Sequence, residues 1–424
     1  MALESIIYFR ILYFQVISFN LTVALRKSQD RSSTSTISYG HEPFATFKKR
    51  VLQLCHTTLG TSDAKFTIER MRGGSFNRVI GISVVDGQKP LIDRYVLRIP
   101  RFDDANLANN IAPLKFLRER TIIPTPDVIQ FDTTTSNPLG SPYAIMTRLS
   151  GSSLWPSYPK LPYEMKVAIA KSLGNVYFEL HSIRSVTSGK LTLSAPNSRE
   201  TLAPGTVVIQ PLDKLDTDIV VPYQSGNASN TTFNTICAIL EHQKELAISR
   251  GPSADYELHF FKRFSVIASE MNNLGMLEEN GYCLCHLDLE ARNILVQQKT
   301  ITGILDWDDA LFAPLFMSCA PPMWLWAWDL NEDDVENEGL AGEIPSNSES
   351  RQLKELFEEA AGPTYLRYAY SPQYRLARTL FKYCIVPITT QQDFDAVALL
   401  RSEWAELRDS LNSPDGPKVA SDQL

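Results

Sequence analysis

The chain lacks the excess positive charge and the regular cysteine spacing that mark several large classes of protein. Its 41 lysines and arginines are outnumbered by 48 aspartates and glutamates, which gives a formal net charge of −7. This balance argues against a general nucleic-acid-binding protein. The 6 cysteines follow no regular spacing and therefore indicate reduced thiols rather than a disulfide framework. We expect a cytoplasmic protein with no nucleic-acid partner.

A long uninterrupted apolar run is also missing. Residues 6–25 are largely apolar, but Arg10, Gln15 and Asn20 interrupt them, and a charge near a helix centre is costly in a bilayer. The polar residues that follow contain no clean cleavage site made of small residues. We favour an N-terminal extension, residues 1–40, that either packs on the body of the protein as an amphipathic strand or helix or is unrelated to its core. Membrane anchoring through the apolar run is the alternative.

What the sequence does contain is enough apolar material for two separate cores. The 424 residues are 44% hydrophobic and 21% charged, a soluble globular composition. Strand-like runs dominate residues 41–150, whereas helical periodicity dominates residues 151–424. Within the second part, residues 185–235 are rich in serine, threonine, proline, glycine and asparagine, which predicts a loop-rich insertion. Helices are expected again at the C-terminal end.

Polar residues at fixed offsets stand among apolar ones in residues 281–310. His286, Asp288 and Asn293 come first, and Asp306 closes a second apolar run. The first three have the spacing His-x-Asp-x-x-x-x-Asn, which is that of a kinase catalytic loop. In phosphoryl transfer one carboxylate orients the acceptor hydroxyl, while an amide and a second carboxylate bind magnesium. The stretch therefore predicts phosphoryl-transfer chemistry.

Two plainer interpretations of this stretch remain open. One is a buried hairpin with polar ends, since residues 294–296 and 301–305 have the composition of two short strands. The other is a zinc site made of Cys283, Cys285, His286 and Asp288. Cys-x-Cys-His without a second cysteine or histidine pair nearby lacks the spacing of structural zinc sites. We favour phosphoryl transfer because both halves of the motif are present.

The stretch resembles the aminoglycoside phosphotransferase and choline kinase family, and above all its fungal members. In that family Asp-Trp, here Asp306 and Trp307, often replaces the Asp-Phe-Gly of protein kinases. The Asp-Phe-Gly and Ala-Pro-Glu signatures of protein kinases are absent. The resemblance implies an α+β, two-lobed protein-kinase-like fold, with a small β-rich N-lobe and a larger, mostly helical C-lobe. It also implies an ATP- and Mg²⁺-dependent phosphotransferase that acts on a hydroxyl of a small molecule.

The resemblance assigns a role to each residue that matches the family pattern. Asp288 would be the catalytic base, and Asn293 and Asp306 would be the Mg²⁺ ligands. His286 would brace the catalytic loop. Arg98, in the strand sequence Val-Leu-Arg-Ile-Pro, would stand in place of the family's phosphate-binding lysine. A solvent-facing strand residue is the plainer interpretation of Arg98.

Further residues would bind the nucleotide. Gly73, Gly74 and Ser75 lie between two predicted strands, where glycines let backbone N–H groups approach phosphates closely. An ordinary hairpin turn is the alternative for these three residues. Met146 and Leu149 lie at the end of a predicted strand that corresponds to the adenine hinge. The contacts there would come from the backbone, which any residue can supply.

One departure from the family pattern concerns the predicted helix at residues 107–120. Relatives carry an acid in this helix that pairs with the phosphate-binding cation, but the matching position here is Asn110. Pro113 should also kink this helix or delay its start. Three other acids could substitute for the missing one: Asp103, Asp104 and Glu119. The departure motivates the alternative function of a catalytically impaired pseudokinase that binds a nucleotide or small molecule.

The acceptor itself is left open by these patterns. Residues 329–343 are strongly acidic, which indicates a solvated loop or, alternatively, attraction of an amine-bearing acceptor. Trp324, Trp326 and Trp328 precede this segment. Such an aromatic cluster is more typical of a core than of a substrate pocket.

Overall fold

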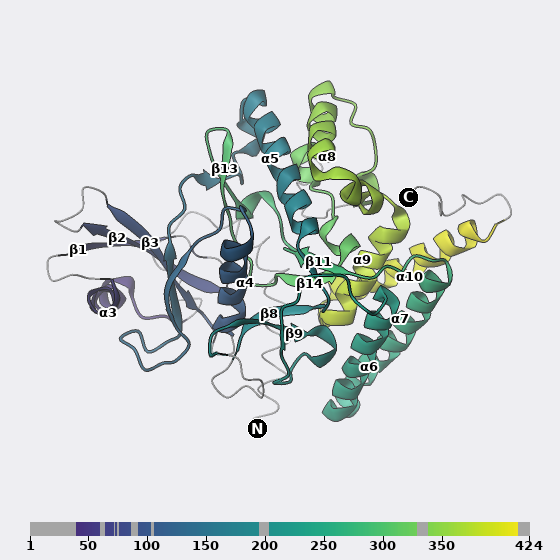
Figure 1. Cartoon of the computed structure of the whole chain (residues 1–424), viewed down its shortest axis with the longest axis horizontal. Helices are drawn as coiled ribbons and strands as arrows, with labels where there is room; N and C mark the ends of the chain where they lie inside the picture. Colours follow the sequence, from purple (N-terminus) through teal and green to yellow (C-terminus); the bar gives the residue numbers. More distant parts are fainter. Residues whose placement is uncertain are drawn as a thin grey trace. The chain divides into compact units, whose positions relative to one another are not determined.

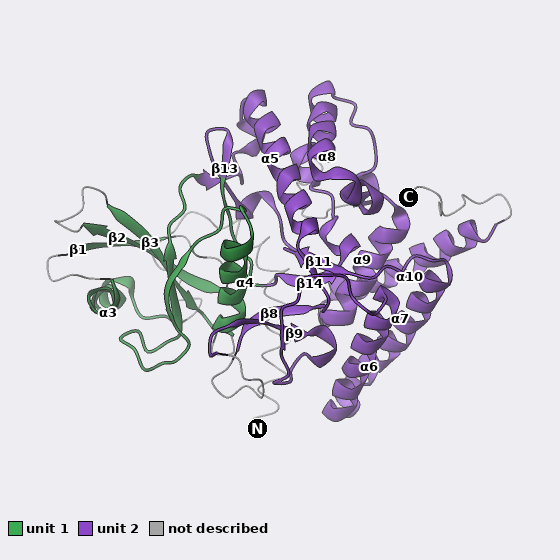
Figure 2. Ribbon diagram, in the orientation of Figure 1, with its two compact units in different colours: residues 1–151, 302–308 green, residues 152–301, 309–424 purple. Residues whose placement is uncertain are grey.

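The computed structural model describes residues 40–59, 64–71, 73, 76–85, 92–102, 106–194, 203–328 and 338–413. The chain divides into two compact units, coloured separately in Figure 2. The smaller unit comprises residues 1–151 and 302–308, and the larger unit comprises residues 152–301 and 309–424. The prediction for residues 6–25 lies outside the described residues. No helix in the described part of the chain is long and apolar enough to span a membrane.

An antiparallel five-stranded sheet forms the smaller unit. Its strands lie in the order β1-β2-β3-β5-β4. Their bounds are β1 (Lys65–Arg70), β2 (Asn77–Val85), β3 (Asp93–Pro100), β4 (Val128–Asp132) and β5 (Tyr143–Thr147). Because successive side chains of a strand point to opposite faces, each of these strands presents one residue set to each side of the sheet.

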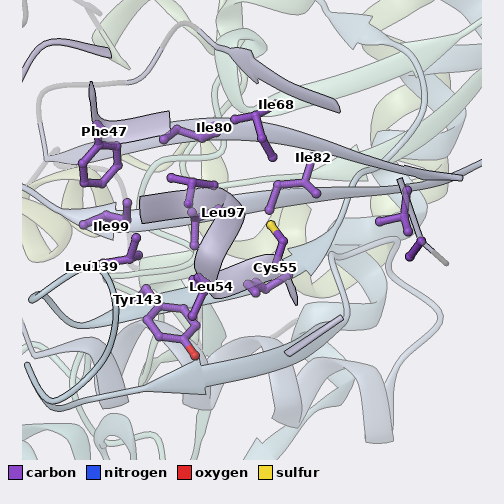
Figure 3. Packing of buried hydrophobic residues seen from close by; sticks show 14 residues of the cluster. Phe47, Leu54, Cys55, Ile68, Ile80, Ile82, Leu97, Ile99, Leu139 and Tyr143 are labelled. Atoms are coloured by element: carbon purple, nitrogen blue, oxygen red, sulfur yellow. The ribbon is translucent and has the colours of Figure 1, made fainter. Parts of the chain in front are cut away.

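Helix α3 (Phe44–Thr58) packs against one of those two faces. Figure 3 shows its Phe47 and Leu54 among side chains from β2 and β3. Those strand residues are Ile80, Ile82, Leu97 and Ile99, all at most 5% exposed. Alternation along β3 then places Arg98 on the opposite face of the sheet, away from α3.

Helix α4 (Leu107–Arg120) is the predicted helix that contains Pro113. The predicted bounds, residues 107–120, are confirmed. Of the two effects expected of Pro113, a kink or a delayed start, the delayed start is not observed, because the helix begins at Leu107 and Pro113 lies inside it. Asn106 caps the first turn, its side-chain oxygen accepting the backbone N–H of Ala108 at 3.0 Å. Burial of Ile111 and neighbouring apolar residues further stabilises the helix against the cost of the proline.

The larger unit is mostly helical. Its helices are α5 (Tyr163–Ser182), α6 (Thr232–Arg250), α7 (Asp255–Asn273), α8 (Ser348–Ala369), α9 (Pro372–Ile385) and α10 (Gln391–Leu411). Helices α6 and α7 pack side by side (Figure 1). Helix α8 is broken at Gly362, whose φ of 82° is a conformation that favours glycine. Short 3₁₀ helices span Tyr158–Lys160, Leu212–Lys214, Pro252–Ala254, Ala291–Asn293, Leu315–Ser318, Met323–Leu325 and Glu338–Leu340.

Two small sheets connect these helices to the catalytic segment. The first has the order β10-β9-β8-β14-β11-β7. Its strands are β7 (Arg184–Ser185), β8 (Gly189–Leu193), β9 (Val207–Pro211), β10 (Val221–Pro222), β11 (Tyr282–Cys285) and β14 (Leu311–Pro314). The second has the order β13-β12-β6, with β6 (Ser152–Ser153), β12 (Ile294–Gln297) and β13 (Thr300–Ile304). Strand β11 leads directly into the loop that contains His286 and Asp288, and β12 follows that loop.

Candidate active site

The loop between β11 and β12 belongs to the larger unit and carries Asp288. The backbone N–H of Asp288 donates to Nδ1 of His286 at 3.3 Å, and His286 is only 3% exposed. Leu287 between them has a φ of 61°, an uncommon conformation for a non-glycine residue that is often found at functional sites. The buried imidazole thus holds the turn that presents Asp288, which is the bracing role expected of His286.

Two side chains fix the carboxylate of Asp288. Asn293 donates from Nδ2 to the Asp288 carbonyl at 2.9 Å and to Oδ2 at 2.8 Å. Arg292 forms an ion pair with Oδ1. The 3₁₀ turn Ala291–Asn293 produces this arrangement because it brings the side chain of Asn293 back over Asp288. With its nitrogen used in this way, the Asn293 amide keeps its oxygen for another ligand.

The surroundings of Asp288 favour its protonated form. Partial burial raises the pKa of this carboxyl to about 6. Arg292 lowers the pKa, Glu290 raises it, the hydrogen bond from Asn293 lowers it, and Asp309 raises it. A carboxylate with a pKa close to neutral is suited to accept a proton from a substrate.

The pH profile of the reaction tests this property. Because the carboxylate is the basic form, we expect kcat/KM to rise with pH through an inflection at about 6. Arg292→Gln removes a charge that lowers the pKa, so its inflection should move to higher pH. Arg292→Lys keeps the charge and should leave the inflection near that of the wild type. An inflection that Arg292→Gln leaves in place would contradict the electrostatic account.

In the smaller unit, Arg98 is paired with a carboxylate that no pattern near it indicated. Its guanidinium donates from Nη1 to Oδ1 of Asp308 at 2.8 Å and from Nη2 to Oδ2 of the same residue. Oδ1 of Asp306 lies 4.0 Å from Nη2. The Arg98 side chain is 13% exposed, so its interpretation as a solvent-facing strand residue is wrong. The side chain is turned inward because the two carboxylate oxygens of Asp308 accept hydrogen bonds from two nitrogens of the guanidinium.

Asp308 therefore occupies the role expected of an acid in α4. The pair joins residues 210 positions apart in sequence, which explains why no local motif revealed it. Of the substitutes suggested by the sequence, Glu119 lies in the exposed last turn of α4, whereas Asp103 and Asp104 lie outside the described residues. The acidic character of Asp308, two positions after Asp306, is the sequence signal that could have suggested it.

A double-mutant cycle measures the strength of the Arg98–Asp308 pair. The two side chains are 13% and 21% exposed, so each single variant, Arg98→Gln or Asp308→Asn, leaves a mostly buried charge without its partner. We expect a coupling of about 2 kcal/mol in the free energy of urea unfolding. The matched control is Arg118–Asp127 in the same unit, an exposed pair at 2.8 Å. Its coupling should be about 0.5 kcal/mol, and a larger value there than at Arg98 would contradict the account.

Asp306 follows the end of β13 with a φ of 65°. This uncommon conformation is maintained by Trp307, which is 1% exposed and donates from Nε1 to the Ile304 carbonyl at 3.0 Å. The Asp306 side chain is 52% exposed. The buried tryptophan thus anchors the turn, and the carboxylate beside it stays open to a ligand.

The residues predicted to bind nucleotide all lie in the smaller unit. A Cβ at Gly73 would lie 2.6 Å from the carbonyl oxygen of Asn77, so only glycine fits this approach of two backbone segments. Gly74 and Ser75 lie outside the described residues. Met146 is buried in β5, opposite Val96 of β3, and Leu149 follows the end of that strand. The roles of these residues remain predictions.

Asn293 in the larger unit and Asp306 in the smaller unit each offer an oxygen donor of a kind that magnesium binds. The amide oxygen of Asn293 and the exposed carboxylate of Asp306 are hard oxygen ligands, and Mg²⁺ is usually bound by one or two carboxylates together with substrate phosphates and water. The described residues contain no cluster of three or more His, Cys, Asp or Glu side chains suited to a metal ion. Cys283 and Cys285 of β11 are fully buried strand residues.

The tryptophans after β14 divide between core and surface. Trp324 and Trp326 are 1% and 6% exposed and belong to the core. Trp328 instead stacks on Trp155 at a ring separation of 4.9 Å, and Trp155 is 39% exposed. Most of the acidic segment, residues 329–337, lies outside the described residues, so attraction of an amine-bearing acceptor stays a prediction.

A β-rich unit with a carboxylate-paired strand cation, together with a helical unit carrying an Asp-Asn loop, defines a protein of the kinase-like phosphotransferase class. The model of the phosphotransferase enzyme family matches residues 67–207 and 255–344, which is more than half of the chain. The chain belongs to this family. The resemblance noted in the sequence and the predicted α+β kinase-like fold class are thereby confirmed.

Two subtelomeric hrmA-associated cluster proteins of Aspergillus fumigatus are similar to the chain. Both are 22% identical to it, over 348 and 352 residues, covering 69% of this chain and 68% of theirs. Among solved structures, aminoglycoside phosphotransferase APH(4)-Ia is 17% identical with a TM-score of 0.44, covering 86% of this chain and 98% of that one. The GDP and kanamycin complex of APH(2″)-IIIa is 17% identical with a TM-score of 0.39, covering 84% and 98%.

Proposed function

We propose that the protein is an ATP- and Mg²⁺-dependent phosphotransferase that acts on a hydroxyl group of a small molecule. The observation that carries this proposal is the environment of Asp288, whose carboxylate is held by Asn293 and Arg292 and has a pKa of about 6. Family membership supports the reaction class. The role proposed for each residue below is argued from the chemistry of its side chain.

Asp288 is the catalytic base in this proposal. Its Oδ2 accepts from Asn293 and its Oδ1 pairs with Arg292, so the carboxylate is fixed before the acceptor binds. It accepts a hydrogen bond from the acceptor hydroxyl and takes the proton as the new phosphate ester bond forms. The bond between the β,γ-bridging oxygen and the γ-phosphorus of ATP breaks, and ADP leaves.

Arg98 supplies positive charge for the donor phosphates in this scheme. Its bidentate pair with Asp308 orients the guanidinium, as a helix acid orients the usual lysine in kinases. Asn293 and Asp306 would hold magnesium, which when bound neutralises the negative charge of the phosphates. Residues 73–75 would cover these phosphates, and the main chain at Met146 and Leu149 would bind the adenine.

Acceptor-stimulated ATP turnover tests the proposal. Wild type and Asp288→Ala are incubated with Mg-ATP and a broad panel of amino alcohols, sugars and aminoglycosides, and ADP release is followed. At least one acceptor should stimulate ADP release by wild type and fail to do so with the variant. If wild type binds Mg-ATP yet no acceptor raises turnover above the variant, the chain is a nucleotide-binding pseudokinase instead.

A further inference from the structure

A group of arginines lies on the face of the small sheet that packs on α3. Arg78 precedes Ile80 by two positions on β2 and so shares the side of these core residues, and Arg101 follows the end of β3, where it contacts His41 just before α3. Contacts confirm the placement, because the Arg78 guanidinium lies 3.7 Å from the ring centroid of Phe47 on α3. Figure 3 shows that ring beside Ile80 and Ile99.

Arg78 and Arg101 also converge on the same short stretch of chain. Arg78 donates from Nη2 to the backbone carbonyl of Glu42 at 3.2 Å, and Nη1 of Arg101 lies 3.3 Å from Nδ1 of His41. These two contacted residues are adjacent in sequence, so the two guanidiniums lie close to one another. All four side chains are partly buried and still reached by solvent.

Positive charge accumulates at this place. Burial lowers the pKa of Arg78 to about 10, and repulsion from Arg101, Arg70 and Arg50 contributes to the shift. Burial also lowers the pKa of His41, together with the charges of Arg101 and Arg78. In the described part of the chain, Arg78 contacts a carbonyl oxygen and an aromatic ring but no carboxylate, because the Glu42 side chain pairs with Arg50 at 3.1 Å.

We propose that Arg78 and Arg101, assisted by His41, form a second phosphate-binding site on the α3 face of the small sheet. Two guanidiniums supply several N–H donors at angles that suit a tetrahedral dianion, and Arg pairs with phosphate in a bidentate manner. Arg98 points to the other face of the same sheet, so this site does not include the proposed donor-phosphate cation. The inference goes beyond the proposed function and does not depend on it.

Arg101 of the proposed site also lies beside Gly73 and Phe76. Nη2 of Arg101 would lie 3.2 Å from a Cβ at Gly73, and the Arg101 backbone N–H donates to the Phe76 carbonyl at 2.8 Å. A phosphate held by Arg101 would therefore lie next to the turn between β1 and β2. The ligand is either free phosphate or the phosphate group of a small phosphomonoester, since both present the same oxygens.

Calorimetric titration of the full chain with inorganic phosphate, and separately with glycerol phosphate, tests the site. Arg78→Gln and Arg101→Gln should each weaken phosphate binding about tenfold, since each removes charge-assisted hydrogen bonds. The matched control Arg118→Gln, an exposed arginine of the same unit that has no part in either proposed site, should change the affinity by less than about twofold. Tighter binding of one probe identifies free phosphate or a phosphomonoester as the natural form.

A variant that should bind phosphate more tightly distinguishes loss of the site from misfolding. Glu42→Gln removes the carboxylate beside the cluster and should tighten phosphate binding by about threefold, an effect that a damaged fold would not produce. Three results would overturn the proposal: neither probe binds, Arg78→Gln and Arg101→Gln bind like wild type, or Arg118→Gln causes the same loss as they do.

Discussion

Asp288→Asn is expected to lower kcat by roughly 10²–10⁴-fold while leaving the affinity for Mg-ATP close to that of wild type. Asparagine keeps the size of the side chain and can still accept a hydrogen bond from Asn293, but it cannot take a proton from the acceptor hydroxyl. The effect should therefore appear in the chemical step. Steady-state kinetics with a saturating acceptor, together with calorimetry of nucleotide binding, separate the two quantities.

Glu290→Gln provides the matched control for this variant. Glu290 lies two residues away in the same loop and raises the pKa of Asp288. Its substitution should change kcat by less than about threefold at neutral pH and move the acid limb of the pH profile to lower pH. Equal losses in Asp288→Asn and Glu290→Gln would mean that the loop as a whole, and not the Asp288 carboxylate, is responsible.

Asp306→Asn is expected to lower kcat by a comparable factor. In this variant the Mg²⁺ requirement should change as well. In the proposed mechanism, the exposed carboxylate of Asp306, which follows β13 beside the buried Trp307, would be the negatively charged donor for magnesium. Its loss should raise the Mg²⁺ concentration needed for half-maximal activity and lower kcat by roughly 10³-fold, since metal stabilisation of phosphoryl charge contributes several kcal/mol. A titration of activity against Mg²⁺ measures both effects.

Two controls accompany this prediction. Chelation of magnesium should abolish turnover by wild type, and readdition should restore it. Asp127→Asn, which removes a carboxylate paired with Arg118 in the same unit, should leave the Mg²⁺ requirement unchanged. An Asp306→Asn variant with a normal Mg²⁺ requirement would remove Asp306 from the metal site.

Short-range sequence patterns were sufficient to predict much of the fold. The composition of residues 294–296 and 301–305 predicted two short strands, which are β12 and β13, and the helix predicted at residues 107–120 is α4. Both signals lie within a short window of sequence. Of the two effects expected of Pro113 in α4, a kink or a delayed start, the delayed start is not observed, because the cap at Asn106 and the buried apolar face stabilise the helix. Tertiary burial outweighed a local rule there.

The candidate site likewise contains features that depend on nearby residues and features that depend on residues far apart in the sequence. The offset between Asp288 and Asn293 is local, and a single 3₁₀ turn turns it into two hydrogen bonds. The Arg98–Asp308 pair depends on residues 302–308 joining the smaller unit, and nothing in the neighbourhood of Arg98 or Asp308 indicates that. The group formed by Arg78, Arg101 and His41 likewise could not be predicted from local sequence, because it depends on the strand register that places Arg78 on the α3 face.

The central claim, transfer of a phosphate to a small-molecule hydroxyl, is tested most directly by phosphorus NMR of the reaction itself. Wild-type protein, Mg-ATP and an acceptor that stimulates ADP release are followed over time. The account predicts a new phosphomonoester resonance that grows in step with ADP and is absent with Asp288→Asn. Formation of inorganic phosphate in place of the ester, or no change in the ATP resonances with any acceptor, would contradict it.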